Sequence, residues 1–227
     1  MYRVEDKFFC SERDLFLLQA RLQTVLRTDE NQKSSDGYTV TSVYFDDLFD
    51  THLQDTVDGH RLREKYRIRI YNGSYDVIKL EVKYKRDNRV LKIARSITPE
   101  QMLNLMKGVC IHTDQDNSED PITLFNLAIA NRGLRPKIIV EYDRNAYVYE
   151  PGNVRITLDR NIRASDQLDA FARGERLTYE YDRDLDQVLE VKYDEFLPGF
   201  IAGILEMGNM NQTSYSKYRI CREIKEV

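Results

Sequence analysis

Alternation of apolar and charged residues is the strongest pattern in this chain. Between residues 65 and 70 the odd positions are Lys or Arg, and the even positions are Tyr or Ile. Successive side chains of a strand point to opposite faces, so Arg67 and Arg69 share a cationic face. Residues 78–85 repeat the alternation, and the intervening Asn72-Gly73 is typical of a tight hairpin. These segments predict two neighbouring antiparallel strands.

The remaining elements follow from the same kind of pattern. Alternation and β-branched residues predict further strands at 3–9, 38–45, 90–97, 137–147, 154–159 and 186–193. Apolar positions at helical spacing, together with capping residues, predict helices at 11–27, 98–107, 121–131 and 198–210. Asp46, Asp47 and Asp50 follow a strand, which favours a helix cap over a metal cluster. The chain is therefore predicted to be α+β.

The charged strand faces allow two interpretations. A single charged face is typical of a solvated surface, but like charges in a row are also stabilised by a polyanion. Because at least five strands share the pattern, we expect a sheet of about eight strands to curl, with helices on its apolar outside and the charges inside. The inward set would be Lys7, Arg67, Arg69, Lys83, Lys92, Arg144, Arg155, Lys192 and Lys217, against Glu5, Glu81 and Glu190. Such an interior must hold water or an anion.

Composition limits which ligands this interior can bind and where the protein is located. The 227 residues carry a formal net charge of −4, so a cationic site is a local concentration and nucleic-acid binding through bulk charge is not expected. No apolar run is long enough to cross a bilayer, and the first residues do not resemble a signal peptide. Three widely spaced cysteines and three histidines predict neither a disulfide framework nor a histidine metal centre. We expect a cytoplasmic protein without membrane insertion.

Several short motifs, taken in order, resemble those of the VTC domain, the polyphosphate polymerase module of the vacuolar transporter chaperone complex. They are Thr41-Ser42-Val43-Tyr44-Phe45-Asp46, Glu81-Val82-Lys83, Tyr142-Asp143-Arg144, Arg155-Ile156-Thr157-Leu158-Asp159, Leu189-Glu190-Val191-Lys192 and Ser216-Lys217-Tyr218. The resemblance extends from Arg3 to near Arg219. It implies a single VTC-like tunnel domain over residues 1–227, with the eight-stranded antiparallel β tunnel of the triphosphate tunnel metalloenzymes and helices packed outside.

The resemblance also implies roles for individual residues. The basic residues that act on the transferred phosphate would be Arg67, Arg69, Lys83, Arg144 and Arg155. Further phosphate-binding residues would be Lys7, Tyr142 and Lys217, with Lys92 and Arg95 competing for one position, and Lys192 joins them from the charged face. Glu190 would bind Mn²⁺ or Mg²⁺, although it would also suit an ion pair with Lys192 or Arg155. Tyr142 would equally suit packing. Ser214 stands where the family has a lysine, and the loss of this positive charge is expected to affect turnover rather than binding.

The implied activity is metal-dependent transfer of the terminal phosphoryl group of ATP, or another triphosphate, to a growing polyphosphate chain. A tunnel open at both ends would let that product thread out. Two alternatives remain open. Attack by water would make the protein a triphosphatase, and a tunnel without turnover would be a module that binds polyphosphate or inositol phosphates. The sequence does not identify a membrane-protein partner.

Overall fold

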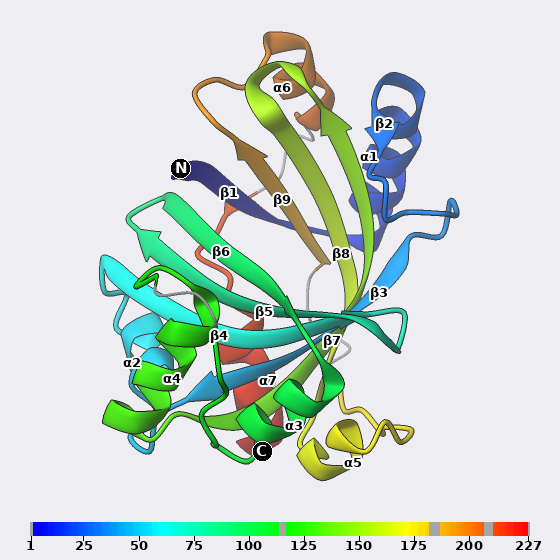
Figure 1. Cartoon of the computed structure of the whole chain (residues 1–227). Helices are drawn as coiled ribbons and strands as arrows, with labels where there is room; N and C mark the ends of the chain where they lie inside the picture. The colour runs from blue at the N-terminus through cyan, green and yellow to red at the C-terminus, as the bar shows by residue number, and fades with distance from the viewer. Residues whose placement is uncertain (1, 114–116, 182–186, 207–210, 227) are drawn as a thin grey trace.

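A closed ring of eight antiparallel strands forms the centre of the molecule. The computed structural model describes residues 2–113, 117–181, 187–206 and 211–226. The ring strands are β1 (Arg3–Cys10), β3 (Tyr38–Asp46), β4 (Leu62–Tyr71), β5 (Ser74–Arg86), β6 (Arg89–Ile97), β7 (Arg135–Tyr149), β8 (Val154–Ser165) and β9 (Gln187–Tyr193). Their order is β1-β6-β5-β4-β3-β7-β8-β9, and β9 returns to β1 (Figure 1). The predicted α+β fold with an eight-stranded antiparallel tunnel is confirmed.

The ring closes unevenly around β1. This strand pairs with β9 along its length, from Val4 opposite Tyr193 to Cys10 opposite Gln187. It meets β6 in only two residue pairs, at Arg3 and Val4. The short strands β2 (Arg27–Thr28) and β10 (Asn211–Gln212) pair with β7 and β1. Among neighbouring ring strands, β1 and β6 therefore share the fewest paired residues.

Helices cover the apolar outer face of the ring in two groups (Figure 1). The first group packs on β4, β5 and β6, where Ile68 and Leu80 share a buried cluster with Leu105 and Phe125. It consists of α3 (Pro99–Met106), α4 (Pro121–Arg132) and α5 (Leu168–Ala172). The second group is α1 (Glu12–Val25) and α6 (Gly199–Leu205), which lie against β1, β8 and β9. The starts predicted for the helices at 11–27 and 98–107 are confirmed, since Ser11 and Thr98 both form capping boxes.

The last helix, α7 (Lys217–Glu226), departs from the predicted arrangement because it packs on the inner face. Tyr44 is opposite Arg67 in the β3–β4 register, so both point inward, and the ring of Tyr218 stacks on Tyr44 at 5.2 Å. Cys221 shares the same buried cluster with Val140 of β7. Apolar inner positions at this end explain the packing. The expectation that every helix lies outside was wrong, and α7 covers the end of the interior that was predicted to be open.

The predicted strands and helices are present, but β8 extends to Ser165, beyond the predicted end at 159, and neither α5 nor α7 was predicted. The predicted helix at 198–210 is α6, which ends at Leu205, and residues 207–210 lie outside the described residues. Position 186, predicted to begin a strand, also lies outside them. The hairpin at Asn72-Gly73 is confirmed by positive φ angles of 52° and 66°.

Of the three acidic residues at the end of β3, Asp46 and Asp47 accept from the first residues of the next helix, whereas Asp50 makes no side-chain cap bond and pairs with Lys137 and Arg222. Asp46 accepts hydrogen bonds from the backbone N–H groups of His52 and Leu53 at the start of α2 (Thr51–Val57). The described residues contain no group of three His, Cys, Asp or Glu side chains placed to hold a metal ion. None of the helices in the described part of the chain is both long and apolar enough to span a membrane.

Candidate functional site

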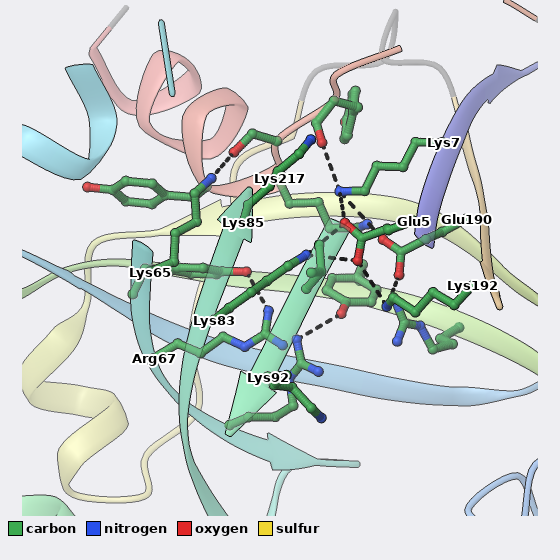
Figure 2. Close-up of a pocket in the computed structure, with 18 of the residues that line it drawn as sticks. Glu5, Lys7, Lys65, Arg67, Lys83, Lys85, Lys92, Glu190, Lys192 and Lys217 are labelled. Atoms are coloured by element: carbon green, nitrogen blue, oxygen red, sulfur yellow. Dashed lines mark hydrogen bonds and ion pairs between the residues drawn. The ribbon is translucent and has the colours of Figure 1, made fainter. Parts of the chain in front are cut away.

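A cavity of about 450 Å³ occupies the interior of the ring (Figure 2). Among the described residues, Glu5 and Glu190 are the carboxylates in its lining. Thirteen cationic side chains face them: Arg3, Lys7, Arg63, Lys65, Arg67, Arg69, Lys83, Lys85, Lys92, Arg144, Arg155, Lys192 and Lys217. The chain as a whole has a net charge of −4, so the positive charge of this cavity is a local excess.

All but one of the predicted site residues line this cavity, and the exception is Arg95. Arg95 is opposite Leu80 in the β5–β6 register, so it lies on the outer face. Its guanidinium donates to Asp120 at 2.9 Å, at the start of α4. Lys92 is opposite Lys83 and points inward. Side-chain alternation therefore assigns the inward position to Lys92, and the prediction that Arg95 binds phosphate was wrong.

One group of cations is organised by Glu81, which is 1% exposed and points inward from β5, beneath the cations that pair with it. The Nε atom of Arg67 donates to Glu81 at 2.6 Å, and the Nζ atom of Lys92 donates to it at 2.9 Å. Arg69 lies 3.7 Å from the same carboxylate and donates to the hydroxyl of Tyr142 at 3.2 Å. Although burial opposes ionisation, Arg67 and Arg69 hold the pKa of Glu81 well below its usual range.

A second group surrounds Asp159, which is fully buried. Arg144 donates to both of its carboxylate oxygens, at 2.6 and 2.7 Å, and Lys217 contacts it at 2.7 Å. Burial opposes ionisation, but Arg144 and Lys217 lower the pKa of Asp159 to about 2. Both cations also sit over the ring of Tyr142, at 5.1 and 4.9 Å from its centre. Asp159 thus joins β8 to the start of α7.

Tyr142 is placed so that both roles left open by the sequence are possible. Its side chain is 2% exposed and belongs to the buried cluster that contains α7, so it packs. It also lines the cavity. Burial opposes ionisation of its hydroxyl, but Arg144 and Arg69 outweigh that effect and lower its pKa. The lowered pKa of Tyr142 therefore reflects the positive charges around its hydroxyl.

The third group contains the two lining carboxylates. Lys83 contacts both oxygens of Glu5 at 2.8 and 2.9 Å, and Lys7 lies 3.5 Å from Glu5 and 3.5 Å from Glu190. Lys192 pairs with both carboxylates. Glu190 therefore has the ion pair with Lys192 that the sequence suggested, whereas Arg155 pairs with Asp29 at 2.8 Å.

The acidity of this third group is set by the same contacts. Burial and the Glu190 charge oppose ionisation of Glu5, but three ammonium groups lower its pKa far below the usual value. Burial similarly opposes ionisation of Glu190, which Lys192 and Lys7 keep charged by lowering its pKa. Burial lowers the pKa of Lys83 to about 7, despite the opposing charge of Glu5. Both carboxylates are thus ionised at neutral pH.

These two carboxylates fit the demands of Mg²⁺ or Mn²⁺. Glu190 is opposite Lys7 in the β1–β9 register, and Lys7 is two residues from Glu5 on β1. The two carboxylates are therefore neighbours on one face, and Lys192 contacts both of them. Mg²⁺ is commonly held by one or two carboxylates, substrate phosphates and water rather than by a cage of protein ligands. The cavity would thus hold such an ion jointly with a phosphate ligand. Sequence analysis placed Glu5 inside the ring but did not assign it to metal.

Sequence analysis missed four cations of the lining: Arg3, Arg63, Lys65 and Lys85. The signal was present, because positions 63 and 65 share the face of Arg67, and position 85 shares the face of Lys83. Lys65 donates to the hydroxyl of Ser216 at 2.6 Å, just before α7. Ser214 lies in the lining as well.

Known structures share this architecture at low sequence identity. HpAC1 from Hippeastrum, an adenylyl cyclase candidate described as having a dominant triphosphatase activity, is 13% identical, with a TM-score of 0.58 and coverage of 98% of this chain and 95% of that chain. An adenylate cyclase candidate from Vibrio parahaemolyticus is 13% identical, with a TM-score of 0.52 and coverage of 100% and 99%. One from Bacillus halodurans is 15% identical, with a TM-score of 0.50 and coverage of 84% and 79%. These similarities show a shared fold.

Sequence comparisons give the family. A search of curated proteins found no match. The family model of the VTC domain matches residues 2–224, which is nearly the whole chain. The ring of eight strands, its cationic interior and the order of the sequence motifs all agree with that match. This chain belongs to the VTC domain family.

Proposed function

We propose that this protein binds a nucleoside triphosphate in its cationic cavity and transfers the terminal phosphoryl group to a growing polyphosphate chain. The observation that carries the proposal is the lining itself, in which thirteen Lys and Arg side chains converge within a chain of net charge −4. Burying this many cations is unfavourable unless anions accompany them. A string of phosphates supplies negative charge at the spacing and density that such a cavity can use.

The buried carboxylates beneath the cations orient them for this task. Glu81 and Asp159 each hold guanidinium groups in fixed orientations, so the forks of Arg67 and Arg144 do not need to be ordered when the ligand arrives. Phosphoryl transfer depends mainly on positioning and on electrostatic stabilisation of charge on the transferred group. The paired arrangement supplies both without a nucleophilic side chain.

The transfer step exchanges one phosphoanhydride bond for another. An oxygen at the end of the polyphosphate chain attacks the terminal phosphorus of the triphosphate, and the bond between that phosphorus and the bridging oxygen breaks. The nucleoside diphosphate leaves with the electron pair of that bond. Mn²⁺ or Mg²⁺, held by Glu190 with Glu5, would neutralise charge on the phosphates. Arg67, Arg69 and Arg144 would hold the same phosphates in line with the attacking oxygen.

A second function, hydrolysis of the triphosphate, is favoured by one specific comparison. HpAC1 shares the fold and is described as having a dominant triphosphatase activity. Water would then take the place of the polyphosphate oxygen as the nucleophile, with the same cations around the phosphates. Ser214, where the family has a lysine, lies in the cavity lining. The missing positive charge would weaken the hold on a polyphosphate end and so favour water as the nucleophile.

The test is to incubate the purified protein with ATP and Mn²⁺ and to resolve the products by chain length. A ladder of polyphosphates is the expected result, and orthophosphate alone would identify a triphosphatase. Tight binding of tripolyphosphate without turnover would identify a binding module. Absence of both binding and turnover would contradict the proposal. Omission of the metal and the variant Arg67→Ala/Arg69→Ala serve as controls.

A further inference from the structure

Six tyrosines of the described residues line the cavity, and two of them differ from the other four. Four have a cation over the ring, at 4.9 to 5.9 Å from its centre: Tyr44, Tyr142, Tyr215 and Tyr218. In the part of the chain that the structure describes, no cation lies over Tyr38 or Tyr71. These two rings contact each other instead, with centres 6.1 Å apart and planes tilted by 58°. A flat ligand can therefore stack on Tyr71, which is half-buried, without displacing a cation.

The two tyrosines lie beside the cations that would hold the phosphates. Tyr71 ends the row of inward side chains on β4, two residues beyond Arg69. Tyr38, at the start of β3, is opposite Arg144. Inward residues that follow one another on a strand are about 7 Å apart, a distance that a ribose can span. A ring stacked on Tyr71 would therefore lie one sugar away from phosphates at Arg69 and Arg144.

Polar groups around these rings are held by Asp29, which is 6% exposed. Arg155 contacts Asp29 at 2.8 Å and donates to the hydroxyl of Tyr38 at 3.2 Å. Asn31, which is exposed and also lines the cavity, donates from its amide nitrogen to Asp29 at 2.6 Å. This bond leaves the amide oxygen of Asn31 as an acceptor. We call Asn31, Tyr38, Tyr71 and Arg155 the aromatic end, which adds a ring face and an acceptor to the cations.

We propose that the aromatic end is a nucleobase subsite, in which the base stacks on Tyr71 and an amino group on its edge donates to the amide oxygen of Asn31. The inference rests on the proposed function, because it names which triphosphates the same cavity selects. Every base has a π-face that can stack on an aromatic side chain. The acceptor adds a preference for a base with an amino group, such as adenine, over hypoxanthine. The phosphates would then extend along β4 from Arg69 to Arg67.

The test measures the affinities of ATP, ITP and tripolyphosphate for the full chain, Tyr71→Leu and Asn31→Ala by calorimetry. Metal is omitted so that the ligands are not consumed. Tyr71→Leu should weaken ATP binding by about tenfold or more and leave tripolyphosphate binding unchanged, because only ATP has a base to stack. The full chain should bind ATP about fivefold more tightly than ITP, whose base lacks the amino group. Asn31→Ala should remove that preference.

Two further variants separate stacking from a general effect on the fold. Tyr71→Phe keeps the ring and should bind ATP like the full chain. Tyr75→Leu is the matched control, because Tyr75 is also half-buried and tilted against a second ring, that of Phe171, but lies outside the lining. It should change none of the affinities. Thermal unfolding curves check that each variant folds, and the exposed position of Asn31 gives a second test that does not depend on Tyr71→Leu folding.

The outcomes distinguish this inference from the proposed function. The nucleobase subsite is overturned if Tyr71→Leu leaves ATP binding unchanged, or if it weakens ATP and tripolyphosphate equally. Equal affinities of the full chain for ATP and ITP would overturn the contact with Asn31. Failure of both ATP and tripolyphosphate to bind the full chain would instead overturn the proposed function.

Discussion

The carboxylates around the cavity fall into two regions that do different work. Glu81 and Asp159 are almost completely buried on the inner face, and each is covered by the cations it holds. Glu5 and Glu190 stand in the lining itself. A carboxylate that is covered by its cations can orient a guanidinium but does not reach the ligand. A carboxylate in the lining can share a metal ion with it. The comparison separates positioning from contact within one ring of strands.

The difference follows from the places of the carboxylates among their neighbours. Arg67 and Lys92, on strands either side of Glu81, lean across it. Arg144 and Lys217 cover Asp159 from β7 and α7. The Glu5 and Glu190 side chains are instead surrounded by lysines, which reach them with single ammonium groups on flexible stems rather than with guanidinium forks. The same ion-pair chemistry therefore gives a fixed support in one region and an adaptable site in the other.

The largest effect is expected from Arg67→Ala/Arg69→Ala. Loss of two charged donors should weaken tripolyphosphate binding by about 100-fold or more, measured by calorimetry. Because Glu81 would be left with Lys92 as its ion-pair partner, the double variant is also made with Glu81→Gln, which removes the buried charge. Arg95→Ala, on the outer face of the same sheet, is the matched control and should bind like the full chain. Undiminished binding in the double variant would place the ligand elsewhere.

The next largest effect concerns Asp159, the buried inward carboxylate of β8. Asp159→Asn leaves the charges of Arg144 and Lys217 buried without their partner, so the free energy of unfolding should fall by about 3 kcal/mol. Tripolyphosphate should recover part of this loss, because it binds the folded state. Urea unfolding with and without ligand measures both. Asp87→Asn, which breaks an exposed pair with Arg61, should have a much smaller effect on stability, because water screens that pair. Equal losses in the two variants would contradict a special role for Asp159.

In the lining, Glu190→Gln should act on turnover more than on binding. We expect metal-dependent turnover to fall by at least roughly 10- to 100-fold, as for other changes around metal ligands, while tripolyphosphate affinity without metal is kept. Activity is measured against metal concentration, so that weaker metal binding appears as a shift of the curve. Glu64→Gln, which removes a carboxylate outside the lining that pairs with Arg132, is the control. Unchanged turnover at every metal concentration would remove Glu190 from the site.

The smallest effect is a pH dependence of stability. The pKa of Asp159 falls from 3.8 to about 2 on folding, so its contribution is complete above pH 3.8 and is lost as the pH falls toward 2. This contribution is on the order of 2 kcal/mol. The free energy of unfolding of the full chain should therefore fall more steeply between pH 4 and about 2 than that of Asp159→Asn. Parallel curves would show that Asp159 does not hold its charge through these contacts.

Alternation along the strands made much of this predictable from the sequence. It placed Arg67 and Arg69 on the inner face, and the structure puts both in the lining. It also placed Lys92 on the inner face, whereas Arg95, which the family resemblance left as a competitor for the same position, lies on the outer face. Local patterns also gave the caps at Ser11 and Thr98, because these depend on residues only three positions apart.

Features that depend on distant contacts were out of reach. The start of α7 carries Lys217 into the cavity, but its inner position depends on apolar residues of β7 and β8. The pairing of Asp159 with Arg144 depends on the β7–β8 register. Likewise, Lys65 and Lys85 form no ion pair with a carboxylate among the described residues, and this can be seen only from the tertiary contacts of the cavity. Sequence periodicity gives the face of a side chain, whereas its partners come from tertiary structure.

The most direct test of the central claim is a crystal structure with tripolyphosphate and Mn²⁺. The account predicts phosphates inside the ring, within hydrogen-bond distance of Arg67, Arg69 and Arg144, and the metal on Glu190. Phosphates bound only on the outer surface, with the interior cations still engaged by Glu81, Asp159 and Glu5 alone, would contradict it.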